Sequence, residues 1–257
     1  MTQSSPYSLP AAAPHYAPPP YAYRDCPVRI VPFRTAPGVT RRLTPEPLEP
    51  AAGDVMFIAV GRMNNDTLGS TQEAFCVVPA RFGSQLGNFC VLLYLESDAC
   101  ITSGREIWGW PKKQARFEHV AGEPALTLVE RGEQIIRIGL GDLESASAED
   151  LGLEPTWFNF KLIPSVVAGA PPEVMQLTAT TFRHVVAREV RRGEPTLVLG
   201  SGPEDPLAEL MPVQEAIGGF SVRLDFELHH GVVLHDYLRE GADVRAEPAP
   251  TLSGAVR

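Results

Sequence analysis

Two adjacent lysines are the side chains of this sequence best suited to covalent chemistry. Lys112 and Lys113 directly follow Trp108-Gly109-Trp110-Pro111, in a region rich in apolar residues. Burial disfavours an ammonium group, and so does a neighbouring like charge, so both effects should lower the pKa of a lysine placed here. At the ordinary pKa near 10.4 only about one lysine in a few thousand is neutral at pH 7, against about half at a pKa of ~7. The stretch therefore predicts a Schiff-base lysine whose pKa is tuned by the neighbouring lysine.

The residues around the lysines predict how they are positioned. Ser97 and Asp98 can cap a helix that runs to about Trp108, and Gly109 and Pro111 should end it, so that the lysines begin a strand. Successive side chains of a strand point to opposite faces. Only one of the two lysines can therefore enter a pocket, and the other must point away from it.

Short apolar runs separated by turn residues predict the α+β class, with a mainly antiparallel sheet or barrel and few helices. We expect one short helix at 37–43, a loop at 62–70, and turns at Arg131-Gly132-Glu133 and Arg192-Gly193-Glu194. The expected strands are 28–33, 55–60, 73–78, 88–95, 125–129, 134–140, 158–164, 174–180, 181–190, 196–199 and 220–228.

Composition limits the class of protein. The chain has 257 residues, 44% hydrophobic and 21% charged, with a net charge of −9, so nucleic acid and anionic membranes are poor partners. We expect one domain over 23–240, between a flexible Pro-rich tail at 1–22 and a flexible tail at 241–257. The sequence contains neither a recognisable secretory signal nor a run long enough to span a membrane, so the expected location is cytoplasmic. The four cysteines are expected to be reduced and buried, although their number also permits two disulfides.

Gly104-Arg105-Glu106 followed by Pro111-Lys112-Lys113 resembles the signature of the acetoacetate decarboxylase family. Weaker similarity lies at 45–49, 158–164 and 207–238, and the resemblance covers roughly 23–240. It implies a β-barrel or cone, a homo-oligomer, and Lys112 as the Schiff-base residue. Acetoacetate decarboxylase is itself the known example of a lysine activated by its surroundings, so the pKa argument is not independent of the resemblance.

The resemblance also implies roles for other residues. Glu73 matches a glutamate that lines the family's pocket and would move protons or orient substrate, and Trp110 would form part of an apolar wall. A second pocket glutamate of the family is matched by Ile58, and a pocket arginine by Cys26. Arg24 or Arg29 would have to replace that arginine in substrate binding.

Several polar motifs receive structural interpretations. Arg105 and Glu106 are expected to hold the helix end by ion pairing, and Gly200-Ser201-Gly202 to form a turn. His229-His230 and His235 lack the ligand spacing of a metal site, so no metal is expected.

The predicted chemistry is decarboxylation of a β-keto acid, acetoacetate or a larger analogue, without cofactor. A lysine iminium accepts the electrons of the breaking carbon–carbon bond, so the protein supplies only a cavity, a proton donor and an orienting group. One alternative is an aldolase or dehydratase of the same superfamily acting on keto acids such as pyruvate. Another is a barrel that binds a small apolar ligand without catalysis.

Overall fold

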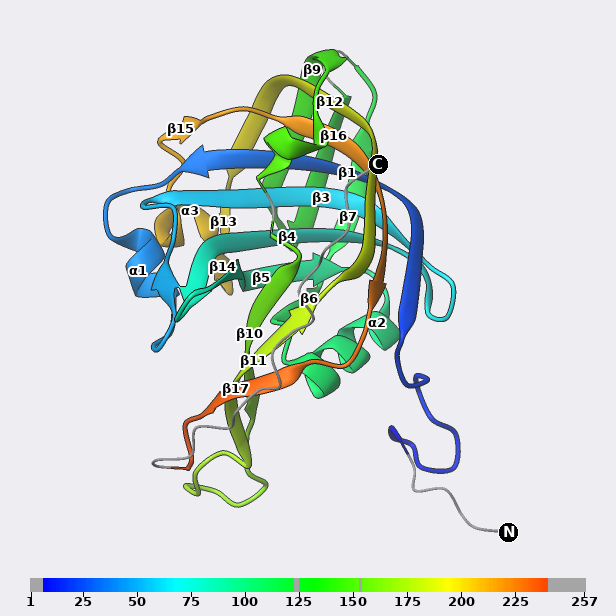
Figure 1. Ribbon diagram of the computed structural model, residues 1–257, viewed down its shortest axis with the longest axis vertical. Helices are drawn as coiled ribbons and strands as arrows, with labels where there is room; N and C mark the ends of the chain where they lie inside the picture. Colours follow the sequence, from blue (N-terminus) through cyan, green and yellow to red (C-terminus); the bar gives the residue numbers. More distant parts are fainter. Residues whose placement is uncertain (1–6, 123–124, 153, 240–257) are drawn as a thin grey trace.

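Long apolar strands give this chain one large β-sheet, which the computed structural model describes over residues 7–122, 125–152 and 154–239. Fifteen strands join in that sheet within these ranges, in the main order β17-β11-β10-β5-β4-β3-β1-β16-β12-β9-β8-β7. The sheet curls without closing, since β7 and β17 remain at the two ends of the order (Figure 1). The predicted class, mainly antiparallel β with a few short helices, is confirmed. The outcome is an open cone and not a closed barrel.

The elements follow one another as follows: β1 (Tyr21–Arg34), α1 (Val39–Leu43), β2 (Glu49–Pro50), β3 (Val55–Asn65), β4 (Gly69–Phe82), β5 (Gln85–Leu95), α2 (Asp98–Ser103), η1 (Gly104–Trp108), β6 (Lys112–Gln114), β7 (Arg116–Val120), β8 (Ala125–Arg131), β9 (Glu133–Ser145), η2 (Ala148–Leu151), β10 (Thr156–Ile163), β11 (Val174–Thr181), β12 (Arg183–Leu199), β13 (Ser201–Gly202), β14 (Asp205–Pro206), α3 (Leu207–Leu210), β15 (Glu215–Ala216), β16 (Phe220–Leu228) and β17 (Val232–Asp236). All the helices of the described ranges are too short to cross a membrane.

Strand β5 is the meeting point of the two halves of the sheet. It pairs antiparallel with β4 and parallel with both β10 and β6. Figure 1 shows β1, β3, β4 and β5 side by side across the molecule, with β10, β11 and β17 extending from one end. The short strand β6 follows η1 after Gly109, Trp110 and Pro111, so the elements around β5 position the two lysines.

Alternation along the strands separates two large apolar clusters on the two faces of the sheet. One cluster contains Phe33, Ile58, Cys76 and Tyr94. The other contains Tyr23, Leu93 and the three tryptophans of the chain. Neighbouring strand residues such as Leu93 and Tyr94 fall in different clusters, as a period of two requires. A third, smaller cluster lies around Phe158 and Leu177.

Two predicted connections are wrong. The loop expected at 62–70 is mostly strand, because β3 and β4 pair as far as Asn65 with Gly69. The turn expected at Arg192-Gly193-Glu194 lies inside β12, where the register shifts and Gly193 passes against the carbonyl of Gly141. Because glycine has no side chain, it allows two backbones to approach closely at a strand irregularity, so a glycine in the sequence does not by itself indicate a turn. The turn at Arg131-Gly132-Glu133 is confirmed, with Gly132 at φ +78°.

The residues before β1 contact the body of the protein. Tyr16 is buried and its hydroxyl donates a hydrogen bond to Glu106 of η1. The Tyr7 ring stands edge-on to that of Tyr16, at a centroid distance of 5.9 Å. Mobility of this tail stays a prediction, and residues 1–6 and 241–257 lie outside the described ranges.

Candidate active site

The segment that leads to the lysines is an α-helix that widens into a π-helical turn. The Ser97 hydroxyl accepts a hydrogen bond from the Cys100 amide, 3.3 Å away, and so caps α2 as predicted. The helix continues as η1, and Gly109 ends it at φ +80°. A Cβ at this position would collide with Lys161, so the site requires glycine for both conformation and space. Single π-helical turns are frequent at functional sites.

Lys112 and Glu73 meet across strand β5. Glu73 of β4 is in register with Leu95, and Lys112 of β6 with Leu93. The Lys112 Nζ lies 3.6 Å from a Glu73 carboxylate oxygen, and the two residues are only 8% and 7% exposed. The structure therefore brings together the two residues that the sequence predicted as catalytic.

Gly104 leaves the space that the Lys112 side chain occupies. A Cβ at 104 would lie 2.6 Å from the Lys112 Cδ, 2.7 Å from Cε and 3.1 Å from Nζ. Arg105 fixes the backbone of the same lysine, since its guanidinium donates to the Lys112 carbonyl at 3.1 Å. Hydrogen bonds thus hold this turn: Arg105 donates one to the Lys112 carbonyl, and Glu106 accepts one from Tyr16. The ion pairing expected of Arg105 and Glu106 is absent from the described residues.

Lys113 points to the other face of the sheet, as strand alternation predicts. Its ammonium donates to an Asp205 carboxylate oxygen at 2.7 Å, and Asp205 also accepts from Tyr94 and Arg131. Burial alone would raise the pKa of Asp205, but these hydrogen bonds outweigh it and hold the pKa below its ordinary value. The Lys113 charge is thus paired with a carboxylate outside the cavity.

A cavity of about 820 Å³ opens beside Lys112. Its inner end contains Glu73, Tyr23 and Leu93, and all of these are buried. Exposed residues, Glu149, Glu154 and His184, belong to its rim. Among the described residues that line the cavity, Lys112 is the only lysine or arginine.

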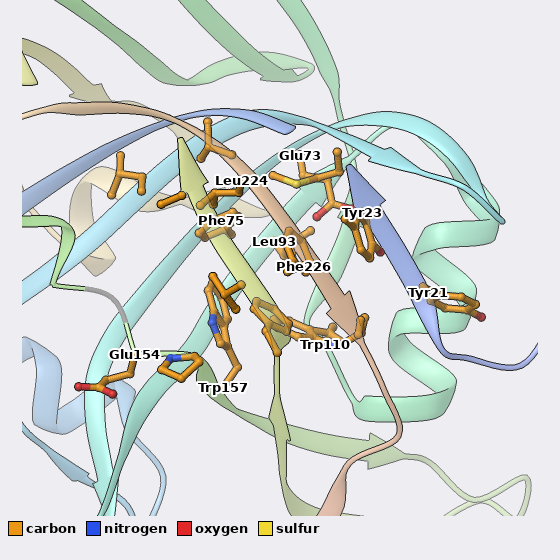
Figure 2. Close-up of a pocket in the computed structure, with 18 of the residues that line it drawn as sticks. Tyr21, Tyr23, Glu73, Phe75, Leu93, Trp110, Glu154, Trp157, Leu224 and Phe226 are labelled. Carbon is orange, nitrogen blue, oxygen red and sulfur yellow. The ribbon is translucent and has the colours of Figure 1, made fainter. Parts of the chain in front are cut away.

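A continuous aromatic wall, formed by Tyr23, Phe75, Trp110, Trp157, Phe182 and Phe226, lines the same cavity. The Tyr23 and Phe226 rings stack at 4.5 Å, and Phe226 stacks on Phe182 at 4.8 Å. The centroid of the Trp157 ring lies 5.6 Å from that of Phe182, 5.2 Å from that of Trp110 and 5.1 Å from that of Phe75. Figure 2 shows Tyr23, Phe75, Trp110, Trp157 and Phe226 converging from different segments of the chain, with Glu73 next to Tyr23. The predicted position of Trp110 in an apolar wall matches this arrangement.

The two candidate arginines lie away from the cavity. Arg24 pairs with Glu227 at 3.2 Å, and Arg29 donates to Thr127 at 3.0 Å. A register shift of β1 between Tyr23 and Cys26 changes which residues face inward. Val28 and Ile30 of the same strand line the cavity where an arginine was expected.

The gapless matches to the family's other pocket residues also miss the cavity. Cys26 is fully buried beside it, and its sulfur accepts a hydrogen bond from the Asn64 amide. Ile58 packs in the cluster on the opposite face, since it pairs with Cys76 while Glu73 pairs with Gly61. The residue of β3 that lines the cavity is Met63.

Tyr23 is a functional candidate that sequence reasoning missed. Burial and the nearby Glu73 carboxylate raise the pKa of its phenol well above the ordinary value, so it stays protonated as a donor. Its only signal in the sequence was the alternation of Tyr21 and Tyr23 at the start of β1. Phe182, between β11 and β12, and Phe226 of β16 are far apart in the sequence, and no local pattern pointed to them.

The described residues contain no group of three His, Cys, Asp or Glu side chains that could hold a metal ion. All four cysteines are free and buried, so the disulfides that their number permitted are not formed. Cys100 lines the cavity, and burial raises the pKa of its thiol. The described site thus offers an amine, a carboxylate and a phenol within an apolar enclosure.

The sequence of the chain matches the family model "Acetoacetate decarboxylase (ADC)" over residues 4–238. "Acetoacetate decarboxylase 2" of Mesorhizobium japonicum is 30% identical over 237 residues, which are 90% of each chain. The chain therefore belongs to the acetoacetate decarboxylase family, and the predicted resemblance is confirmed. As its sequence predicted, it is an acetoacetate decarboxylase-like carboxy-lyase.

Solved structures agree with this assignment. Acetoacetate decarboxylase from Legionella pneumophila superposes with a TM-score of 0.82 at 25% identity, covering 93% of this chain and 99% of that one. The enduracididine biosynthesis enzyme MppR, complexed with the condensation product of pyruvate and imidazole 4-carboxaldehyde, has a TM-score of 0.78. MppR is 17% identical to this chain, and the match covers 92% of this chain and all of the MppR chain. At this identity the similarity shows a shared fold and nothing about activity.

Proposed function

We propose that this protein decarboxylates a β-keto acid through a Schiff base on Lys112. The observation that carries the proposal is the buried Lys112–Glu73 pair, 3.6 Å apart, at the inner end of an apolar cavity. Such a pair supplies a nucleophile and a proton acceptor in one place. Acetoacetate decarboxylase is itself the known instance of this lysine chemistry, so the family assignment and the geometry support the same reaction.

The proposed reaction needs no group beyond these side chains. The neutral Lys112 Nζ adds to the keto carbon C3, and loss of water leaves an iminium ion. The C1–C2 bond then breaks, its electron pair forms the C2–C3 double bond of an enamine, and CO2 leaves. A proton returns to C2, and water cleaves the iminium to release a methyl ketone and the free amine.

Each nearby side chain has a role in this sequence of steps. Glu73 accepts the proton of the Lys112 ammonium and returns one to C2, because its carboxylate is the nearest base. Tyr23 lies beside Glu73 and can donate a proton to the departing hydroxyl of the carbinolamine; solvent replaces this proton, since the net reaction of the carboxylate consumes one. Trp110 contributes to the wall that keeps water from the enamine.

The same iminium could instead serve aldol condensation or dehydration of a keto acid such as pyruvate. The observation that favours this second candidate is the cavity volume, about 820 Å³, which has room for two small reactants. Release of CO2 separates the two functions, since aldol chemistry retains the carboxylate. A protein that binds a ligand without catalysis would form no covalent adduct at all.

The deciding experiment is borohydride reduction in the presence of acetoacetate or, separately, pyruvate, followed by peptide mapping. We expect a reduced adduct on Lys112 with acetoacetate, none in Lys112→Ala, and an unchanged adduct position in Lys113→Ala. Release of CO2 should require Lys112 in the same way. An adduct with pyruvate but no CO2 from β-keto acids would favour the aldolase. Folded protein that forms no adduct with either compound would refute the Schiff-base proposal.

Homo-oligomerisation and a cytoplasmic location remain predictions. The hairpin between β10 and β11 supports the first, since Leu162, Val166 and Val167 on it are 50%, 97% and 62% exposed. Exposed apolar side chains gathered on one segment mark contact surfaces. Light scattering of the purified protein measures the mass, and a monomer at all concentrations would refute the oligomer.

A further inference from the structure

The cavity is much larger than acetoacetate. Acetoacetate has seven non-hydrogen atoms, which at roughly 30 Å³ each, the share of a water molecule, occupy about 200 Å³. The cavity holds about 820 Å³ and extends from the buried Lys112 to an exposed rim. A volume of this size is typical of pockets for ligands several times larger.

The chemistry of the lining changes along this cavity. Charge is confined to the inner end, where Lys112 and Glu73 pair, and to exposed rim residues. Between them lies the aromatic wall, whose Phe182 and Trp157 rings are 5.6 Å apart. The keto and carboxylate groups of a substrate can interact with Lys112 and Glu73 at the inner end. The middle of the cavity presents aromatic ring faces and no cation, so it suits an apolar group.

The geometry points to a β-keto acid with an aromatic or long apolar substituent on C4 as the substrate class of this enzyme. The keto acid group lies at Lys112, and the substituent lies against the aromatic wall toward the rim. This inference rests on the proposed Schiff-base function. Aromatic rings pair with offset-stacked or edge-on partners, and the rings of the wall present both faces and edges at 4.5–6.4 Å from one another.

The discriminating probe is 3-oxo-5-phenylpentanoate, which adds a benzyl group to acetoacetate and yields CO2 and 4-phenylbutan-2-one. Each buried methylene is worth a factor of roughly four in binding. Burial of about four of the seven added carbons gives an expected preference of at least ~100-fold in kcat/KM over acetoacetate.

A variant of the wall tests where the preference arises. Phe182 is half-buried and touches the rings of Trp110, Trp157 and Phe226, so Phe182→Ala should reduce the preference by about tenfold. Its matched control is Phe160→Ala, because Phe160 is also half-buried but packs on Tyr237 outside the cavity. The control should retain the preference.

A second measurement uses the unaltered protein. Borohydride trapping with 4-phenylbutan-2-one and with acetone compares the two tails without any decarboxylation step. We expect half-maximal trapping at a concentration roughly 100-fold lower for the phenyl ketone. Equal trapping and equal kcat/KM would overturn the inference and leave the proposed function intact. Absence of any adduct in folded protein would refute the proposed function, and this inference with it.

Discussion

Replacing Gly104 by alanine tests whether the space opposite the lysine aligns the nucleophile. The added Cβ would lie 2.6 Å from the Lys112 Cδ, whereas carbon atoms in contact are about 3.5–4.0 Å apart. The lysine must therefore move by about 1 Å. A displacement of this size costs roughly 100-fold in rate when it misplaces a reacting group. The backbone at Gly104 is right-handed helical, at φ −63° and ψ −44°, so alanine fits it and could even stabilise the helix by ~0.5–1 kcal/mol.

The assay combines kcat for CO2 release with the thermal unfolding temperature. We expect Gly104→Ala to lose about two orders of magnitude in kcat while its unfolding temperature stays the same or rises. The matched control is Gly218→Ala, because a Cβ at Gly218 would meet no atom within 4 Å. Full activity of Gly104→Ala, with normal borohydride trapping, would refute the reasoning that this glycine sets the position of Lys112.

Three further predictions concern charged and nucleophilic groups. Glu73→Gln should reduce kcat roughly 100-fold by removing the base beside Lys112, and unchanged kcat would exclude that role. Asp205→Asn should reduce the free energy of unfolding by about 3 kcal/mol at pH 7, measured by urea denaturation, because it leaves Lys113 and Arg131 without their buried partner. Since the folded pKa of Asp205 is below the unfolded value of about 3.9, its stabilisation is complete above that pH and is lost as pH falls through the folded pKa. Stability that is flat down to pH 2 would contradict this. Burial raises the pKa of Cys26 to about 11, so iodoacetamide should label it only after unfolding, and rapid labelling of native protein would refute its burial.

The sequence was most informative where chemistry and local geometry agree. Alternation along a strand was enough to predict that Lys112 and Lys113 face opposite ways. The stop at Gly109 placed both lysines at a strand start, which the structure confirms. The meeting of Lys112 with Glu73 required the family resemblance in addition, because nothing local joins residues on β4 and β6.

Sequence reasoning failed where the register of long strands decides. The shift in β1 turns Val28 and Ile30 toward the cavity and Arg29 away from it, and a single sequence does not reveal such a shift. The aromatic wall likewise comes from segments far apart along the chain, and the antiparallel pairing of β12 with β16, which joins Arg183 to Glu227, brings Phe182 and Phe226 together. Individual strands were predictable, but their relative register was not.

The absence of a second cation from the described lining also affects the energetics of the proposed bond-breaking step. Lys112 and Glu73 balance each other before substrate enters, so a bound keto acid carboxylate has no counter-ion of its own. Iminium formation moves the positive charge of Lys112 onto a nitrogen that is double-bonded to the substrate, two bonds from the carbon that carries the carboxylate. When CO2 leaves, the electron pair of the broken bond neutralises the iminium, so the carboxylate charge and the iminium charge both disappear and an uncharged enamine remains. Since opposite charges disappear in this step, a medium of low polarity favours it over the solvated starting state. The phenyl and indole rings of the cavity thus act as a solvent for the reaction as well as a surface for the substrate.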